Sequence, residues 1–320
     1  MLLSIVVPVY NSEMYIIECL DSILDQLLYN TEVIIINDAS TDKSLSLIKD
    51  CINSLDEEKR KLIRLVSLEE NRGVGFARMH AIKICNGDYI CSIDPDDVVS
   101  RQFIKNIMII LQDYKPDIVQ FQISRFYKKP RDGELLSNNF LEAGMHLMQT
   151  KTRQRFYEQS FWSFCTRIIR KELLSNIDLS ILRNCEDVYA LPLIFLKSQN
   201  IYILDECYYY YRLNKKSLSK NNNLTHVKNQ TESYKYILDR YLNYIEKDPQ
   251  LFYALIPIFR SYLNFCLIHH DSNYAKLEYS YYNEKINKSY NSNKIFNKLS
   301  HNLFIIFGLP SLYLLRFISR

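Results

Sequence analysis

Four short apolar runs alternate with amphipathic segments near the start of the chain, and this alternation restricts the fold more than any other feature. The runs are LLSIVVPVY (2–10), EVIIIND (32–38), KLIRLVSL (61–68) and DYICSID (88–94). The segments 12–26, 40–52 and 74–87 between them carry apolar residues at helical spacing. Alternating strands and helices predict an α/β fold with right-handed crossovers and a mostly parallel, Rossmann-like sheet flanked by helices.

Three of these predicted strands carry polar residues at their carboxyl ends. These residues lie within positions 8–11, 37–40 and 94–97. Open α/β sheets bind ligands beyond the carboxyl ends of their strands. The sequence therefore predicts a binding rim at that end of the sheet.

The alternation loosens after residue 99. We expect helices over 101–114 and 185–198, strands over 116–124 and 201–212, and a basic helix within 161–174. Residues 230–300 have a helical pattern. The predicted domains are a nucleotide-sugar half of the catalytic region at 1–99, an acceptor half at 100–220 and a helical C-terminal extension at 221–320.

Composition excludes several functional classes. The formal net charge of +4 over 320 residues is too small to favour nucleic acid as a partner. The eight cysteines include no C-x-x-C pair, which is typical of reduced thiols in a cytoplasmic protein. The apolar start has no basic region before it and no cleavage site, so we interpret it as a buried strand rather than a signal peptide.

Three carboxylates, Asp94, Asp96 and Asp97, lie within four positions after the fourth apolar run. One interpretation is structural, since aspartate and proline are common in turns and at helix starts. The other is a site for Mg²⁺ or Mn²⁺, which take carboxylate oxygens and leave positions open for phosphate. Such an ion would neutralise the charge on a departing diphosphate.

Four motifs in order resemble those of family 2 glycosyltransferases, which have a GT-A type fold. The stretches are Pro8-Val9-Tyr10-Asn11, Asn37 to Asp42, Asn71 to Arg78 and Gly87 to Asp97. The resemblance is good over about residues 3–125 and looser over 160–220. Asn37 and Met79 depart from the family pattern, in place of an aspartate and an asparagine.

The resemblance implies roles for the motif residues. Pro8, Tyr10 and Asn11 belong to the nucleoside-binding element, with Asp38 facing the base edge, which favours a uridine donor. Arg78 would pair with the donor or with Asp94, and Asp94 would flank the sugar and diphosphate. Asp96 and Asp97 would be the metal ligands.

A second acidic pair, Glu186 and Asp187, starts the predicted helix at 185–198. An inverting transfer needs a base for the acceptor hydroxyl, and such a base contributes on the order of 10²–10⁴ in rate. By the resemblance, Asp187 is that base and Glu186 orients it or binds acceptor. On residue chemistry alone, both acids could simply favour the positive end of the helix.

Two further residues are candidates for substrate contact. Trp162 is either a platform for an acceptor sugar ring or a core residue. Arg212, with Lys215 and Ser217 after it, could close over the diphosphate as part of a loop. The sequence lacks the QxxRW-type motif of processive family members, so we expect addition of a single sugar.

The C-terminal segment 303–320 is strongly apolar and follows several lysines. Each apolar piece is shorter than the roughly 20 residues that span a bilayer. One interpretation is peripheral contact with the inner face of the cell membrane. The other is a helix docked on the core or on a second subunit of a homo-oligomer.

These features predict a metal-assisted, inverting glycosyltransferase. It would move one sugar from a nucleotide-diphosphate donor, UDP-linked, to a glycan or lipid-linked acceptor in bacterial surface polysaccharide synthesis. One alternative is a non-catalytic sugar-nucleotide-binding or membrane scaffold protein. Another is a nucleotidyltransferase, but PVYNSEMY after the first strand lacks the glycine-rich, basic loop that it would need.

Overall fold

The computed structural model describes residues 1–136, 138–214 and 223–292. The chain divides into two compact units, which are described one at a time. The first comprises residues 1–152 and 161–220, and the second comprises residues 153–160 and 221–320.

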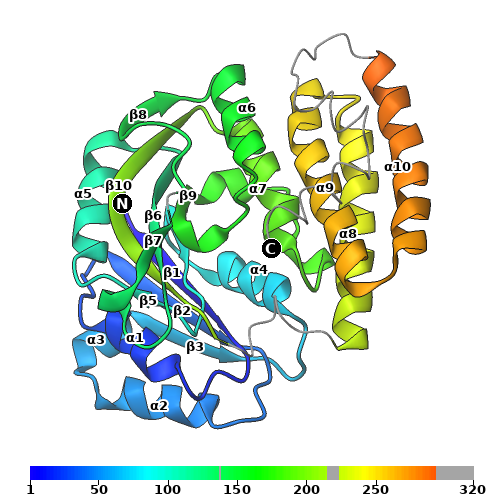
Figure 1. The fold of residues 1–320 in the computed structure, drawn as a ribbon. Helices are drawn as coiled ribbons and strands as arrows, with labels where there is room; N and C mark the ends of the chain where they lie inside the picture. Colours follow the sequence, from blue (N-terminus) through cyan, green and yellow to red (C-terminus); the bar gives the residue numbers. More distant parts are fainter. Residues whose placement is uncertain (137, 215–222, 293–320) are drawn as a thin grey trace. The chain divides into compact units, whose positions relative to one another are not determined.

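The first half of the sheet is parallel, as predicted. Strands β1 (Leu3–Val9), β2 (Thr31–Asn37), β3 (Ile63–Ser67) and β4 (Tyr89–Ser92) pair in the order β3-β2-β1-β4 (Figure 1). Leu3 lies opposite both Thr31 and Tyr89. Every residue of β1 and β2 is buried, which explains why these strands are continuous apolar runs rather than alternating ones.

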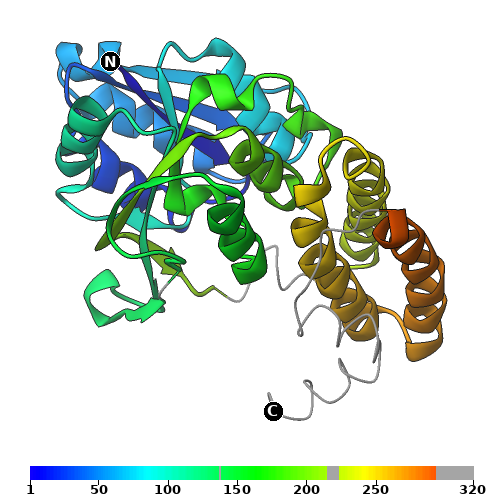
Figure 2. The same ribbon diagram turned by 90° about the horizontal axis from the view of Figure 1, so that it is seen from above.

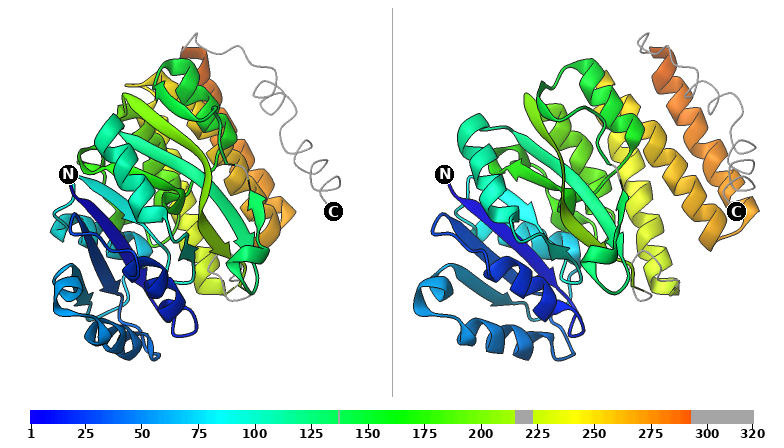
Figure 3. Two further views of the ribbon diagram at one scale, coloured as in Figure 1. Left: turned by 90° about the vertical axis from the view of Figure 1, so that its left-hand side faces the viewer. Right: turned by 60° about the vertical axis from the view of Figure 1, so that its left-hand side comes forward.

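Helices cover both faces of this parallel part. They are α1 (Ile16–Leu24), α2 (Ser44–Ser54), the short α3 (Glu57–Lys61) and α4 (Val74–Ile84). The chain passes through α1 and α2 on its way from β1 to β3, and returns through α4 to β4 on the other side of β1. With right-handed crossovers, α4 lies on the opposite face from α1 and α2 (Figures 1 and 3). The strand order thus reverses between β1 and β4, which is where such sheets bind ligands.

The second half of the sheet is mixed, continuing from β4 as β9-β6-β10-β5. Its elements are β5 (Val98–Val99), α5 (Phe103–Tyr114), β6 (Ile118–Phe126), β7 (Glu134–Leu136), β8 (Gly144–Leu147), β9 (Arg167–Arg170), α7 (Glu186–Lys197) and β10 (Asn200–Arg212). Strand β9 is antiparallel to both β4 and β6, whereas β10 is parallel to β6. The predicted α/β class is confirmed, and residues before and after position 100 build one sheet.

The expected basic helix within 161–174 is wrong, because β9 occupies its centre. Ile168 and Ile169 are buried on opposite faces between two neighbouring strands. Arg167 is fully buried as well, and its guanidinium donates to the carbonyl oxygens of Ser163 and Phe161. These two carbonyls provide hydrogen bonds for a buried charge that the sequence pattern assigned to a basic helix.

The second unit is helical, as predicted. It includes most of α6 (Thr150–Gln159), together with α8 (Leu224–Tyr244), the turn η6 (Pro249–Leu251), α9 (Phe252–His269) and α10 (Ser272–Ser292). Helix α9 packs against both α8 and α10 (Figure 2). Tyr241, Tyr262 and Tyr282 are fully buried, so the tyrosine-rich composition here supplies a core.

Within the described residues, one segment, Pro249–His269, is long and apolar enough to cross a membrane. In its most apolar 18-residue stretch, 78% of the residues are buried inside the structure, which fits the central helix of a packed bundle. The apolar segment 303–320, for which membrane contact was one interpretation, lies outside the described residues.

Candidate active site

The acidic loop after β4 is held by the far end of β10. The Tyr209 hydroxyl donates to Asp97 Oδ2 at 2.6 Å, and the Arg212 backbone N–H donates to Asp97 Oδ1 at 2.7 Å. Asp97 is 0% exposed. Since both of its oxygens bond inside the protein, Asp97 does not face the rim, contrary to the expectation that it binds metal.

Asp96, like Asp94, keeps partial access to solvent. Its Oδ2 accepts a hydrogen bond of 2.6 Å from the Asn214 amide. Burial, and then the charge of Asp94, raises the pKa of Asp96 to about 6. The negative charge of Asp94 thus disfavours ionisation of Asp96.

A partly exposed Asp96 with a second carboxylate on the same loop is the arrangement that fits a divalent cation. Among the residues that the structure describes, no group of three or more His, Cys, Asp or Glu side chains forms a closed metal cage. Hard cations need not have one, because they bind through one or two carboxylates and complete their shell with water and substrate phosphates. Asp96, with Asp94 beside it, suits that arrangement.

Arg78, in the first turns of α4, joins this loop to a distant helix. Its Nε donates to Ser92 Oγ at 2.9 Å and its Nη2 to Asp94 Oδ1 at 2.6 Å. Its Nη1 pairs with Oε1 of Glu186, the first residue of α7. Arg78 and Glu186 are 6% and 4% exposed. Their burial leaves little surface for contact with substrate, which favours the other predicted roles, the pairing of Arg78 with Asp94 and the orientation of Asp187 by Glu186.

Asp187 follows Glu186 at the start of α7 and is partly exposed. Its Oδ1 accepts a hydrogen bond of 2.8 Å from the Val188 N–H. Burial, reinforced by the charge of Glu186, raises the pKa of Asp187 to about 7. The preceding residue, Cys185, has φ of 63°, a left-handed conformation that non-glycine residues adopt mainly where the fold imposes it.

The loops after β1 and β2 form the neighbouring part of the rim. Pro8 is buried in β1, and Tyr10 beyond it is 46% exposed. Asn11 has φ of 48°, and its Oδ1 accepts from the Thr41 N–H at 2.8 Å. Tyr10 is thus available for stacking on a ring, while Asn11 ties the two loops together.

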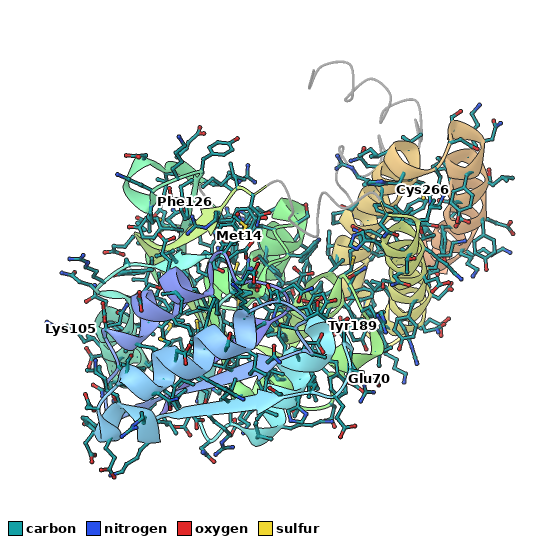
Figure 4. The ribbon with its side chains drawn as sticks, turned by 90° about the horizontal axis from the view of Figure 1, so that it is seen from below. Met14, Glu70, Lys105, Phe126, Tyr189 and Cys266 are labelled. Carbon is teal, nitrogen blue, oxygen red and sulfur yellow. The ribbon has the colours of Figure 1, made fainter. Side chains whose placement is uncertain are left out.

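Asp38 was expected to face the base of the nucleotide at the rim, but its side chain points into the protein. It is 2% exposed, and its carboxylate accepts from the N–H groups of Arg72 and Gly73, both at 2.8 Å. The Asn71 amide donates to it as well, at 3.0 Å. Asp38 holds the loop that follows Glu70, which Figure 4 labels. Burial raises its pKa, and the two backbone N–H groups oppose that shift.

Arg212 is not a loop residue closing over the site. It ends β10 and is 6% exposed, with Nε donating to the Asp96 carbonyl at 2.8 Å and Nη2 to Glu18 Oε2 at 2.5 Å. Its guanidinium lies 4.5 Å from the ring of Phe126, which Figure 4 labels. Lys215 and Ser217 lie outside the described residues.

Trp162 is partly buried in the segment that leads into β9. Neither of its two interpretations is decided by this placement.

Three residues of the site were not singled out from the sequence. They are Ser92, which binds Arg78, Asn214, which binds Asp96, and Tyr209, which binds the acidic loop. Ser92 lies inside the motif that ends β4, so its position was a usable signal. Tyr209 is one of four consecutive tyrosines, and no pattern in the sequence distinguishes the one that faces Asp97.

Comparison with known proteins shows which family the chain belongs to. The family described as "Glycosyl transferase family 2" matches residues 4–178, which is more than half of the chain. The chain belongs to glycosyl transferase family 2. The predicted family is therefore confirmed.

The family 2 chain is similar to part of two longer relatives. It is 27% identical over 235 residues to the glycosyltransferase GlyA of Streptococcus pneumoniae, covering 68% of this chain and 31% of the relative. It is 29% identical over 215 residues to the minor teichoic acid biosynthesis protein GgaB of Bacillus subtilis, covering 66% of this chain and 23% of the relative. The match thus spans less than a third of either relative.

The fold is also found in a solved structure of a glycosyltransferase. The crystal structure of S. aureus TarS 1–349 in complex with UDP-GlcNAc superimposes with a TM-score of 0.66 at 22% identity, covering 91% of this chain and 89% of that one. This similarity confirms the GT-A fold with a helical C-terminal region.

Proposed function

We propose that this family 2 chain is an inverting glycosyltransferase. It moves one sugar from a UDP-linked donor to a hydroxyl group of a cell-surface glycan or lipid-linked acceptor. The observation that carries the proposal is Asp187, a partly exposed carboxyl whose pKa is raised to about 7 and which is linked through buried charges to the acidic loop. A pKa near the working pH is what a general base needs.

The chemistry requires one displacement. Ionised Asp187 accepts the proton of the acceptor hydroxyl as its oxygen attacks the anomeric carbon. The bond between that carbon and the diphosphate oxygen breaks, its electrons leave with UDP, and the configuration inverts. Tyr10 is exposed where a base would stack, and Asp94 and Asp96 border the sugar and diphosphate. A divalent cation, when bound at Asp96, supplies positive charge for the leaving diphosphate.

The donor and acceptor classes are supported by the relatives. The TarS crystals contain UDP-GlcNAc, and GgaB is named for teichoic acid synthesis. We extend a UDP-sugar donor and a surface-glycan acceptor to this chain on that basis. We place the reaction in the cytoplasm. Peripheral membrane contact would bring the chain to a lipid-linked acceptor, and this part of the proposal rests on the sequence of the tail.

Release of UDP from a panel of UDP-sugars tests the proposal. Wild type would be compared with Asp187→Asn and Asp96→Ala in the presence of Mn²⁺ and of Mg²⁺. We expect losses of roughly 10²–10⁴ for Asp187→Asn, the usual contribution of a general base. Asp113→Asn, an exposed change on α5, is the control and should keep full activity.

A non-catalytic protein that binds sugar nucleotides is the alternative. It has no use for a carboxyl with a pKa near neutrality, which speaks against it. If wild type binds UDP-sugars but releases no UDP with any acceptor extract, the enzyme proposal is overturned. If wild type and Asp187→Asn release UDP at the same rate, Asp187 is not the base.

A further inference from the structure

Arg78, on α4, contacts three other parts of the chain. Ser92 ends β4, Asp94 starts the acidic loop and Glu186 starts α7. Each of the three guanidinium nitrogens has its own partner, at 2.9 Å for Ser92 and 2.6 Å for Asp94, with Glu186 as the third. The side chain is 7% exposed. Arg78 therefore acts inside the protein rather than on a ligand.

The contacts join parts of the chain that the backbone does not connect. Glu186 is 108 residues from Arg78, and Asp94 is 16 residues from it. Only a planar fork with nitrogens facing several directions can hold a hydroxyl and two carboxylates at once. A lysine ammonium keeps the charge but cannot span the same three partners.

We propose that Arg78 is a positioning residue. Through Asp94 and Glu186 it holds the acidic loop and the base Asp187 in fixed positions relative to each other. This inference rests on the proposed function, since it concerns how the base is placed and charged. Asp187 is adjacent to Glu186 on the same turn of α7. A shift of Arg78 would move Glu186 and therefore the base relative to the sugar.

Electrostatics supports the same link. After burial, the largest influence on the pKa of Asp187 is Glu186, which raises it, and the next is Arg78, which lowers it. Asp94 also raises it, and Arg167 is the other buried cation whose charge interacts with Asp187. Arg78 and Glu186 thus shift the pKa of the base Asp187 in opposite directions.

This opposition gives a test that a purely structural role would not pass. The pH dependence of kcat would be measured for wild type, Glu186→Gln, Arg78→Met and the double variant, with UDP affinity followed by calorimetry. Nearby charges shift a pKa by roughly one to three units. We expect the acidic limb of the profile to move to lower pH by about one unit in Glu186→Gln. In Arg78→Met it should move to higher pH, and in the double variant it should return toward wild type.

Arg78→Lys keeps the proposal testable if Arg78→Met does not fold. Here the acidic limb should stay near its wild-type position, while kcat falls about tenfold or more because the base is misplaced. UDP affinity should change much less than kcat, since Tyr209 and Arg212 still hold the acidic loop. Circular dichroism would check the fold of every variant.

Arg170→Met is the matched control. Arg170 is also ion-paired, with Nε 2.9 Å from Asp117, but it lies opposite Tyr89 at the other end of β4. Its loss should reduce stability without moving the acidic limb.

The outcomes separate this inference from the proposed function. If wild type shows no turnover, the proposed function fails, and if Asp187→Asn is fully active, the assignment of Asp187 as its base fails. If wild type turns over but the acidic limb stays fixed in both Glu186→Gln and Arg78→Met, the inference is overturned. Unchanged kcat in Arg78→Lys would also overturn it.

Discussion

The hydroxyl of Tyr209 donates a hydrogen bond of 2.6 Å to the carboxylate of Asp97, 112 residues earlier in the chain. The same oxygen accepts a bond of 3.1 Å from the Asp94 N–H. One phenol on β10 therefore fixes both ends of the acidic loop. The bond matters because Asp97 is fully buried, and a buried carboxylate that loses a partner is strongly destabilising.

Replacing Tyr209 by Phe should lower the free energy of unfolding by about 1–3 kcal/mol, the usual penalty for an unsatisfied buried group. It should also weaken donor binding, since the loop would lose its anchor. Urea denaturation and UDP calorimetry would measure the two effects. Tyr210→Phe, one residue along the same strand, is the control. Equal losses in both variants would contradict the role given to Tyr209.

Gly75 is required by close packing at the start of α4. A Cβ at this position would lie 2.4 Å from the carbonyl oxygen of Leu179 and 2.8 Å from that of Leu182. Gly75→Ala should therefore destabilise the protein by about 1–3 kcal/mol or more through overpacking. Thermal unfolding would measure it.

Gly144→Ala provides a contrast to that change. Its added methyl group meets no atom within 4 Å, although φ of +119° still imposes strain. If Gly75→Ala proved no more destabilising than Gly144→Ala, the close approach to Leu179 would not matter for stability.

The raised pKa of Asp187 predicts a pH-dependent stability. The pKa of the folded form, about 7, exceeds the ordinary value of 3.8, so between these values the unfolded chain binds fewer protons. This group therefore contributes a loss of stability as pH rises from about 4 to 7. Asp187→Asn should unfold at higher denaturant concentration than wild type at pH 8, with the difference vanishing near pH 4.

Ionisation of Asp187 should raise activity with increasing pH, whereas it lowers stability. The base works only when ionised, so kcat should rise as pH increases through about 7. A rate profile measured with saturating donor would show this limb. A flat profile from pH 5 to 8 would contradict the assignment of Asp187, as would a variant Asp187→Asn that is no more stable than wild type at pH 8.

Arg212→Lys should weaken the acidic loop. The change removes the fork that reaches both the Asp96 carbonyl and Glu18, and it removes the stacking on Phe126. We expect a loss of about 1–3 kcal/mol in unfolding free energy, because hydrogen bonds to charged groups are worth more than neutral ones. The matched change Glu18→Gln should cost less than about 1 kcal/mol, since Glu18 remains half exposed. A larger loss for Glu18→Gln than for Arg212→Lys would reverse this ranking.

Several parts of the fold could be predicted because they depend on local pattern. The runs at 2–10 and 32–38 are rich in Val and Ile, and both contain fully buried parallel strands. The segment 161–174 failed because its apolar and basic residues fit either period. Its strand is decided by the neighbours β4 and β6, which the segment itself does not encode.

The site divides in the same way. The sequence by itself determined that Asp94 to Asp97 and Asn37 to Ser40 lie at one rim, because residues that follow parallel strands emerge at the same edge of a sheet. Only the tertiary structure decided which carboxylates face outward. Asp38 and Asp97 are turned inward because they form hydrogen bonds with Gly73 and Tyr209. These partners lie 35 and 112 residues away in the chain, and no spacing within a motif predicts such distant contacts.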